Sequence, residues 1–400
     1  MKHRRVITVH EHQELKFRHT DLREEEVQLL SAQSLKTREQ FYQVRYSSIK
    51  FSNYVGIIKV GNVVIEVLPK IDYVEGENNF WRSVLIEMLQ ISGFIPKIFD
   101  DKVNISSYSS SLLDILFLHY LKMVENILSR GLIKTYVHKE ENKNVIKGKI
   151  LIGEDVKRNY AHKERAYCDH SVFTSNNFYN AIIKQTLSLI STNTTQPIIS
   201  SKSRSLLLYF DGIDEVKIAS EKIFEKMPKS RKYQYYKNVM TLSKLILFGN
   251  SITLNQGRDN VFSMFFDMNL LFEKYMGKMC KRALGRSVKL QREKYFWKNK
   301  KIRPDIIIEA ENNIAIDTKW KIGGKGPIDA DLKQMYVYGR YFDADKTILL
   351  YPHHANFLEQ SGSFRDGSGT CSLISINIFN ENGRLKKDFS EEIYAMIGQN

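Results

Sequence analysis

The stretch RPDIIIEAENNIAIDTKWK, residues 303–321, decides the fold of the C-terminal part of this chain. Two short apolar runs, Ile306–Ile308 and residues 314–316, are separated by a polar segment that includes residues 311–313. Short apolar runs rich in β-branched residues and bounded by a polar turn are typical of strands. The stretch therefore predicts a β-hairpin, with its second strand continuing to Lys319.

The register of this hairpin decides which side chains meet. Side chains alternate along a strand, so Asp317 and Lys319 should share a face and Thr318 should project from the other. Asp305 stands at the start of the first strand, after Pro304, which cannot donate to the ladder. An odd-length loop places Asp305 and Asp317 on one face, whereas a two-residue turn separates them unless a bulge intervenes. We therefore predict a loop of three or five residues, or a bulged strand.

Two carboxylates and a lysine on one face suit hydrolysis of a phosphodiester, which places extra negative charge on anionic oxygens. Asp305 and Asp317 can hold a hard divalent cation, for which Mg²⁺ is the expected choice. The cation polarises phosphorus and acidifies a bound water, and Lys319 can orient that water or stabilise the developing charge. The alternative is an ordinary charged surface hairpin, because D-x-K alone is common. The longer pattern is more specific than D-x-K: Pro304-Asp305 is followed, after eleven residues, by Asp317-x-Lys319 between apolar strands.

A helix is expected before the hairpin, because apolar residues in SMFFDMNLLFEKYMGKMCKRALG recur at helical spacing. Asp267 can cap its start and Gly285 its end. Glu273 lies on this helix and either adds a third carboxylate to the metal site or faces solvent. Gly277, one turn further on, allows a close approach by another element.

A second helix is predicted after the hairpin, over residues 331–342. Gln334 and Tyr338 lie one turn apart on it and can share a face. They can hold a phosphate or the candidate catalytic Lys319. The alternative is a tyrosine packed in the core beside an exposed glutamine.

The chain is basic, with 60 lysines and arginines against 45 acids among 400 residues, a formal net charge of +15. This excess fits a polyanionic partner, although solubility alone can also explain it. We expect the basic residues just before the acidic pair to hold a DNA backbone. They are Lys294, Lys298, Lys300, Lys301 and Arg303. Residues 216–237 mix seven lysines or arginines with three tyrosines and fit either a DNA groove or a solvated helix face.

Changes of periodicity divide the chain into three ranges. Residues 1–110 are expected to form a β-rich N-terminal domain, in which Gly61-Asn62 joins two strands of a hairpin. Residues 111–254 are mostly helical, with a less regular or β-rich part over 132–175. Residues 255–400 read as an α/β domain with a mixed central sheet flanked by helices, preceded by this α+β N-terminal region. Helices are also predicted over 81–91 and over 112–130, where Gly131 suits the C-terminal cap.

The three cysteines lie far apart and form no metal-ligand cluster, which favours a reducing, cytoplasmic compartment. The N-terminus lacks the apolar core of a signal peptide. The most apolar stretch, from Leu112, is interrupted by charged residues and is expected to be a core helix. We therefore expect no membrane association.

The motif P-D…D-T-K, with a glutamate on the preceding helix and Q-x-x-x-Y on the following one, resembles the PD-(D/E)xK nuclease superfamily, particularly its RecB-like branch. Further segments resemble the McrC family, the nuclease subunits of McrBC-type, modification-dependent restriction systems. These segments are YVGIIKVGNVVIEVLPKI (54–71), SRGLIKTYVHKEENKNVIKGKI (129–150) and LLFEKYMGKM (270–279).

The resemblance implies a Mg²⁺-dependent DNA endonuclease domain in residues 255–400. Its metal-binding acids correspond to Asp305 and Asp317, and its catalytic lysine corresponds to Lys319. Glu273, as a further metal ligand, and Gln334 correspond only at the level of the superfamily.

The resemblance also implies a separate AAA+ GTPase of the McrB type, which recognises modified double-stranded DNA and translocates, while the N-terminal half of this chain docks on it and stimulates it. The chain itself lacks a GxxxxGK[ST] phosphate loop, because GGKGP at residues 323–327 has the wrong spacing. Two alternatives stay open: a self-sufficient RecB-like nuclease, and a non-catalytic adaptor that activates a motor.

Overall fold

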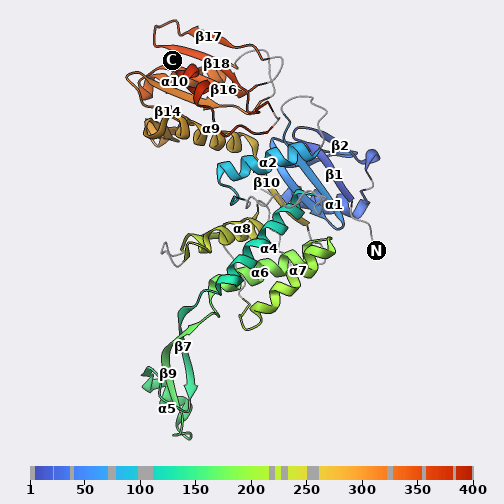
Figure 1. Cartoon of the computed structure of the whole chain (residues 1–400), viewed down its shortest axis with the longest axis vertical. Coiled ribbons are helices and arrows are strands. Elements are labelled where there is room, and N and C mark those ends of the chain that lie inside the picture. The colour runs from blue at the N-terminus through green and yellow to red at the C-terminus, as the bar shows by residue number, and fades with distance from the viewer. Residues whose placement is uncertain are drawn as a thin grey trace. The chain divides into compact units, whose positions relative to one another are not determined.

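The computed structural model describes residues 5–20, 22–36, 40–70, 78–97, 111–215, 221–226, 233–249, 261–321, 328–353, 357–381 and 384–398. The chain forms two compact units (Figure 1). The first unit comprises Met1–Asp101 together with Thr253–Asn400, and the second comprises Lys102–Ile252. Whether the first and third ranges of the sequence act as separate domains stays a prediction.

The N-terminal part of the first unit is built on a four-stranded sheet in the order β1-β6-β5-β10. Its strands are β1 (Arg5–His10), β5 (Tyr54–Val60), β6 (Val63–Leu68) and β10 (Val261–Asp267). Val60 pairs with Val63, so Gly61-Asn62 forms the predicted two-residue turn, in which Gly61 adopts a φ of 55°. β6 is buried along its whole length, because its side chains are apolar except that of Glu66, which forms an ion pair with Arg82 at 2.6 Å.

The strand β10 comes from the C-terminal range and pairs antiparallel with β5. Phe265 lies opposite Gly56, which has a φ of 144°. A Cβ atom on Gly56 would lie 2.0 Å from the carbonyl oxygen of Met264, so only glycine allows the two strands to approach this closely. The N-terminal sheet is therefore complete only with a strand from beyond residue 260.

Smaller elements surround this sheet. A second sheet, in the order β2-β4-β3, contains β2 (Glu14–Lys16), β3 (Tyr42–Val44) and β4 (Ser48–Phe51). It is accompanied by η1 (Phe17–His19), α1 (Glu24–Lys36) and α2 (Asn78–Ser92). The helix α2 contains the predicted helix over 81–91.

The C-terminal part of the first unit contains a six-stranded mixed sheet in the order β11-β14-β15-β16-β18-β17. Its strands are β11 (Val288–Leu290), β14 (Ile306–Ile308), β15 (Asn313–Thr318), β16 (Ala344–Pro352), β17 (Gln360–Ser363) and β18 (Thr370–Ile376). The β14–β15 pair is antiparallel and the β15–β16 pair is parallel, so the predicted mixed sheet is confirmed. A separate two-stranded sheet is formed by β12 (Lys294–Trp297) and β13 (Lys300–Ile302).

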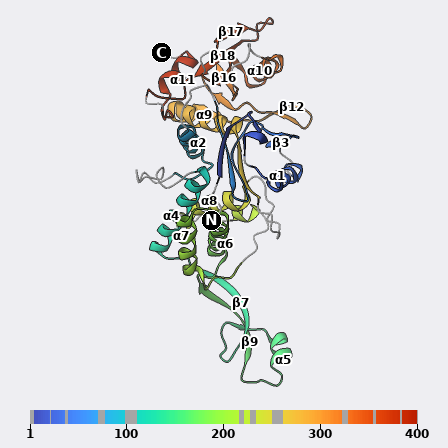
Figure 2. The same ribbon diagram turned by 90° about the vertical axis from the view of Figure 1, so that its right-hand side faces the viewer.

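Helices accompany this sheet and set its surroundings. The crossover from β15 to β16 is α10 (Asp329–Phe342), whose Met335 and Phe342 pack with Ala315 and other apolar residues of the sheet. The helix α9 (Met268–Leu284) packs beside α2 and β15, and α11 (Ser390–Ile397) packs against α9 (Figure 2).

Both predicted ends of α9 are confirmed. The Asp267 side chain accepts a hydrogen bond from the Asn269 amide at 2.8 Å, and Gly285 closes the helix with a φ of 62°. The expected close approach at Gly277 is to Leu290 of β11, because a Cβ atom on Gly277 would lie 3.0 Å from Leu290 Cδ2. α9 is therefore held tightly against the strand that neighbours β14.

The second unit combines helices with a long two-stranded ribbon. The helices are α4 (Leu112–Arg130), α6 (Phe178–Asn193), α7 (Pro197–Leu207) and α8 (Lys237–Phe248), with η2 (Leu208–Phe210) and η3 (Glu221–Lys226). The ribbon pairs β7 (Thr135–Lys143) with β9 (Ala166–Thr174) and carries β8 (Lys149–Ile150) and α5 (Ile152–Asn159) (Figure 1). Gly131 ends α4 as predicted, with a φ of 86°. Within the described residues, no helix has the length and apolar character needed to cross a membrane.

Candidate metal and catalytic site

The hairpin β14–β15 sets the two central carboxylates opposite each other. Ile308 pairs with Ile314, and Ile306 pairs with Ile316. Five residues, 309–313, therefore join the paired positions, which confirms the odd-length connection. Extended by one step, this register places Asp305 across from Asp317, on the face of Ile307 and Ala315, which pack in one core cluster with Met335 of α10.

Asp317 and Lys319 share a face of the strand end, as alternation requires. The Lys319 ammonium lies 2.8 Å from Asp317 Oδ2 and 3.3 Å from Oδ1 of Asp331, which stands in the first turn of α10. Asp317 is only 4% exposed, and the side chain of Lys319 is 18% exposed. The lysine is therefore held by two carboxylates at a partly shielded position.

The α10 side chains complete this cluster. Gln334 Nε2 donates to Asp317 Oδ1 at 3.1 Å and to the Tyr338 hydroxyl at 2.6 Å, while Gln334 Oε1 accepts from Lys319 at 3.3 Å. The Tyr338 hydroxyl donates to the carbonyl oxygen of Arg303 at 3.1 Å. Tyr338 is thus buried, as expected for a tyrosine packed in the core. It also shares a helix face and a hydrogen bond with Gln334, as expected for a pair at the site. The catalytic part of Gln334 stays a prediction.

Asp305 is held by a residue that strand alternation did not predict. Its Oδ2 accepts hydrogen bonds from the backbone amide and the hydroxyl of Thr318, both at 2.7 Å. Alternation assigns Thr318 to the opposite face, but Thr318 is the last residue of β15 and its hydroxyl reaches the carboxylate there.

Glu273 is connected to Asp305 through Gln291, which the sequence did not single out. Gln291 Nε2 donates to Glu273 Oε1 at 2.6 Å, and the Gln291 amide donates to the Asp305 carbonyl oxygen at 3.0 Å. Gln291 adopts a left-handed φ of 50°, which is unfavourable for a residue other than glycine or asparagine. No local pattern indicates this conformation. Asp331, in contrast, could have been found, because it precedes Gln334 by three residues on one helix.

The pKa values of both central carboxylates are raised, because burial and neighbouring acids outweigh the nearby positive charge. Burial, followed by the negative charge of Glu273, raises the pKa of Asp305 to about 6. Burial and then the charge of Asp305 raise the pKa of Asp317 to about 6, although Lys319 opposes this shift. Burial lowers the pKa of Lys319, but Asp317 and Asp331 outweigh it and raise the pKa overall. Lys319 is therefore protonated at neutral pH.

The donor set fits a divalent cation. Carboxylate oxygens are the ligands that Mg²⁺ prefers, and two opposed carboxylates whose pKa values are both raised are stabilised by a cation between them. Within the described ranges, no three histidine, cysteine, aspartate or glutamate side chains already converge to hold a metal ion. Asp317 instead forms an ion pair with Lys319, and Glu273 accepts a hydrogen bond from Gln291. Binding would require these side chains to exchange partners.

Trp320, directly after Lys319, fixes this strand end to the N-terminal sheet. Its Nε1 donates to Glu11 Oε1 at 2.6 Å, and its ring lies 5.4 Å from that of Phe272, the residue before Glu273. Glu11 is 3% exposed, and burial raises its pKa to about 7.

The predicted phosphate-contacting residues lie on and just after β12–β13. Arg303 and all of the lysines except the half-buried Lys294 are exposed. Lys301 forms an ion pair with Glu293 at 2.7 Å. Their contact with DNA stays a prediction.

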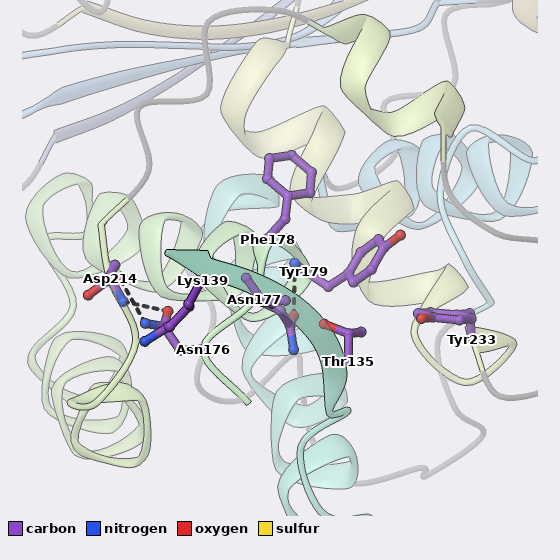
Figure 3. Close-up of a pocket in the computed structure, with 9 residues that line it drawn as sticks. Thr135, Lys139, Asn176, Asn177, Phe178, Tyr179, Asp214 and Tyr233 are labelled. Carbon is purple, nitrogen blue, oxygen red and sulfur yellow. Dashed lines mark hydrogen bonds between the residues drawn. The ribbon is translucent and has the colours of Figure 1, made fainter. Parts of the chain in front are cut away.

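A separate pocket of about 510 Å³ lies in the second unit, at the start of the β7 ribbon (Figure 3). Its two asparagines and Asp214 are engaged in local structure. Asn176 Nδ2 donates to Asp214 Oδ2 at 2.7 Å, and Asn177 caps α6. The rings of Tyr179 and Tyr233 are 5.2 Å apart at its edge. We assign no chemistry to this pocket.

These features define an α/β protein whose mixed sheet ends in a carboxylate–lysine cluster. Residues 49–352 match the family described as McrBC 5-methylcytosine restriction system component, and the chain belongs to this family. No curated protein matches the chain.

Two solved structures show the same fold. A chain of the refined half-complex from the tetradecameric assembly of Thermococcus gammatolerans McrB AAA+ hexamers with bound McrC has a TM-score of 0.73 and 20% identity. That match covers 96% of this chain and 97% of the other. A chain of the Thermococcus gammatolerans McrBC complex has a TM-score of 0.56 and 20% identity, over 70% of this chain and 88% of the other.

Proposed function

We propose that this chain is the DNA-cleaving subunit of a McrBC-type restriction system and hydrolyses phosphodiester bonds with Mg²⁺. Membership of the McrBC family supports the system. The observation that carries the chemistry is the opposition of two shielded carboxylates, Asp305 and Asp317, beside the ammonium of Lys319. This arrangement is the one expected of a PD-(D/E)xK nuclease domain.

The residues divide the work as follows in this proposal. Asp305 and Asp317 would hold Mg²⁺, with Glu273 as a third carboxylate, and the ion would supply polarisation of the scissile phosphate and a more acidic water. Lys319, kept protonated by its acidic neighbours, stabilises the negative charge that develops on the phosphate oxygens. Gln334 fixes the ammonium through its Oε1 atom.

We further propose that the chain acts with a AAA+ GTPase of the McrB type. The similar structure from Thermococcus gammatolerans contains McrB AAA+ hexamers with bound McrC, which supports such a partner. In this proposal residues 1–110 dock on the GTPase and stimulate it, and the partner selects modified double-stranded DNA.

The test is a GTP-dependent cleavage assay on methylated and unmethylated DNA, with the chain co-purified with the product of the adjacent gene. Asp317→Ala and Lys319→Ala should each abolish cleavage while leaving GTP hydrolysis intact. The exposed residues Asp345 and Lys333 supply matched controls, and their alanine variants should cleave normally.

Two results would contradict parts of this proposal. Cleavage by the chain alone with Mg²⁺ would make it a self-sufficient nuclease. Restriction that survives both site substitutions would make it an adaptor without catalytic activity.

A further inference from the structure

The hairpin β12–β13 (Figure 2) carries three consecutive aromatic residues that are exposed to solvent. Tyr295, Phe296 and Trp297 are 63%, 42% and 59% exposed. The other two of the chain's three tryptophans, Trp81 and Trp320, are 3% and 4% exposed. Exposed aromatic residues gathered in one place indicate a contact surface, because aromatic side chains gain most from being covered.

The positive charge around these rings indicates a negatively charged partner. Residues 294–301, KYFWKNKK, contain four lysines and no acid. The Lys301 ammonium lies 5.1 Å from the centre of the Tyr295 ring, and that of Lys298 lies 5.2 Å from the Trp297 ring. Aromatic rings interleaved with cations suit a polyanion that also offers flat apolar faces, and a nucleic acid strand has both.

The hairpin is shaped and anchored rather than a loose extension. A bulge interrupts the pairing between Tyr295 and Trp297, and Lys298 turns the chain with a φ of 42°. Tyr341 of α10 donates through its hydroxyl to the Phe296 carbonyl oxygen at 3.1 Å, and its own carbonyl oxygen accepts from Lys294 at 2.5 Å. The helix that carries Gln334 therefore also holds the hairpin.

The hairpin also leads directly into the candidate site. β13 ends at Ile302, and Asp305 follows three residues later. The carbonyl oxygen of the intervening Arg303 is fixed by Tyr338. A DNA strand that lies along the hairpin can thus continue toward the carboxylates of Asp305 and Asp317.

We propose that β12–β13 is a base-contacting element, in which Tyr295 and Trp297 stack on the bases of an unpaired DNA strand and the adjacent lysines hold its phosphates. This inference rests on the proposed function, because it takes DNA as the substrate. It goes further by assigning the contact to base faces, which are open to side chains only where the strand is unpaired or unstacked.

The experiment uses the full-length chain, a mixed-sequence single-stranded oligonucleotide, and EDTA to prevent cleavage. Binding should quench the fluorescence of Trp297, and Trp297→Phe should remove this signal while keeping most of the affinity. The double variant Tyr295→Ala/Trp297→Ala should bind the oligonucleotide about tenfold or more weakly. Its dependence of affinity on salt should stay unchanged, whereas Lys298→Ala/Lys300→Ala should reduce that dependence. Tyr46→Ala, at a fully exposed tyrosine elsewhere, is the control and should bind normally.

The outcomes separate this inference from the proposed function. If the wild-type chain binds the oligonucleotide but Trp297 fluorescence and the double variant's affinity are unchanged, the base contact is wrong and the cleavage proposal stands. If the double variant keeps DNA binding and loses the AAA+ partner on co-purification, the hairpin is a protein-docking surface and the inference is wrong. If the wild-type chain does not bind the oligonucleotide, the inference is wrong, and the cleavage proposal is decided separately by the GTP-dependent assay.

Discussion

The raised pKa of Asp317 predicts that removing its charge stabilises the protein while destroying its chemistry. The pKa of about 6, against an ordinary 3.8, means that between these two pH values the folded state holds a proton that the unfolded state has released. Above pH 6, keeping Asp317 ionised therefore destabilises the folded chain, by up to about 3 kcal/mol for a shift of this size. Asp317→Asn removes this penalty, and the new side chain can still accept from Gln334.

The assay is thermal unfolding with and without Mg²⁺ across pH. At pH 8 without metal, Asp317→Asn should unfold at most roughly 6–12 °C above the wild type, from about 3 kcal/mol at about 2–4 °C per kcal/mol. The difference should shrink as pH falls below 6, because the wild-type carboxyl then takes up its proton. Mg²⁺ at ten times its dissociation constant should stabilise the wild type by about 1.4 kcal/mol and the variant by much less.

A control with the opposite electrostatics sharpens this test. Asp366 is exposed, and hydrogen bonds from Ser368 and Tyr336 lower its pKa to about 2. Asp366→Asn should therefore give no stabilisation and should leave the Mg²⁺ response intact. The reasoning is refuted if Asp317→Asn is less stable than the wild type at pH 8 without metal, or if Mg²⁺ stabilises both equally.

Three further predictions concern stability and are measured by chemical denaturation. Gly56→Ala should destabilise by about 3 kcal/mol or more, because its φ is positive and its Cβ would meet backbone, whereas Gly153→Ala, with open space around it, should not destabilise. Gln291→Ala should destabilise by about 1 kcal/mol, and Gln291→Gly by less, because glycine accepts the left-handed φ; equal losses would contradict this. Trp320→Phe should destabilise by about 1–3 kcal/mol, because it leaves the Glu11 carboxylate without its indole donor, and Glu11→Gln in the same chain should restore part of the loss.

The central hairpin could be predicted from sequence because all of its determinants are local. Strand alternation and the number of residues between two apolar runs decide which side chains share a face. Asp305 and Asp317 were predicted to share a face because the connection between the strands has an odd number of residues. The two ends of α9 were predicted from the capping residues Asp267 and Gly285. Whether the acids bind a metal depends on chemistry that no pattern of residues tests.

Other parts of the site depend on backbone geometry or on distant residues. Gln291 reaches Glu273 from a left-handed conformation that its own side chain does not favour. Thr318 meets Asp305 through its backbone amide and its hydroxyl, a contact that strand alternation does not predict. The indole of Trp320 finds Glu11 from the other end of the sequence. No local pattern in the sequence predicts any of these three contacts.

The pairing of β5 with β10 has a consequence for the order in which the chain folds during synthesis. Residues 69–260 must be made after β6 before β10 emerges, which takes about 10–40 s at about 5–20 residues per second. Until then the edge of β5 is unpaired and open to pairing with another chain. The second unit can fold during this interval, since its residues are contiguous. α9, with Glu273, follows β10 directly, so the candidate site is assembled last, on a scaffold that its own chain has just completed.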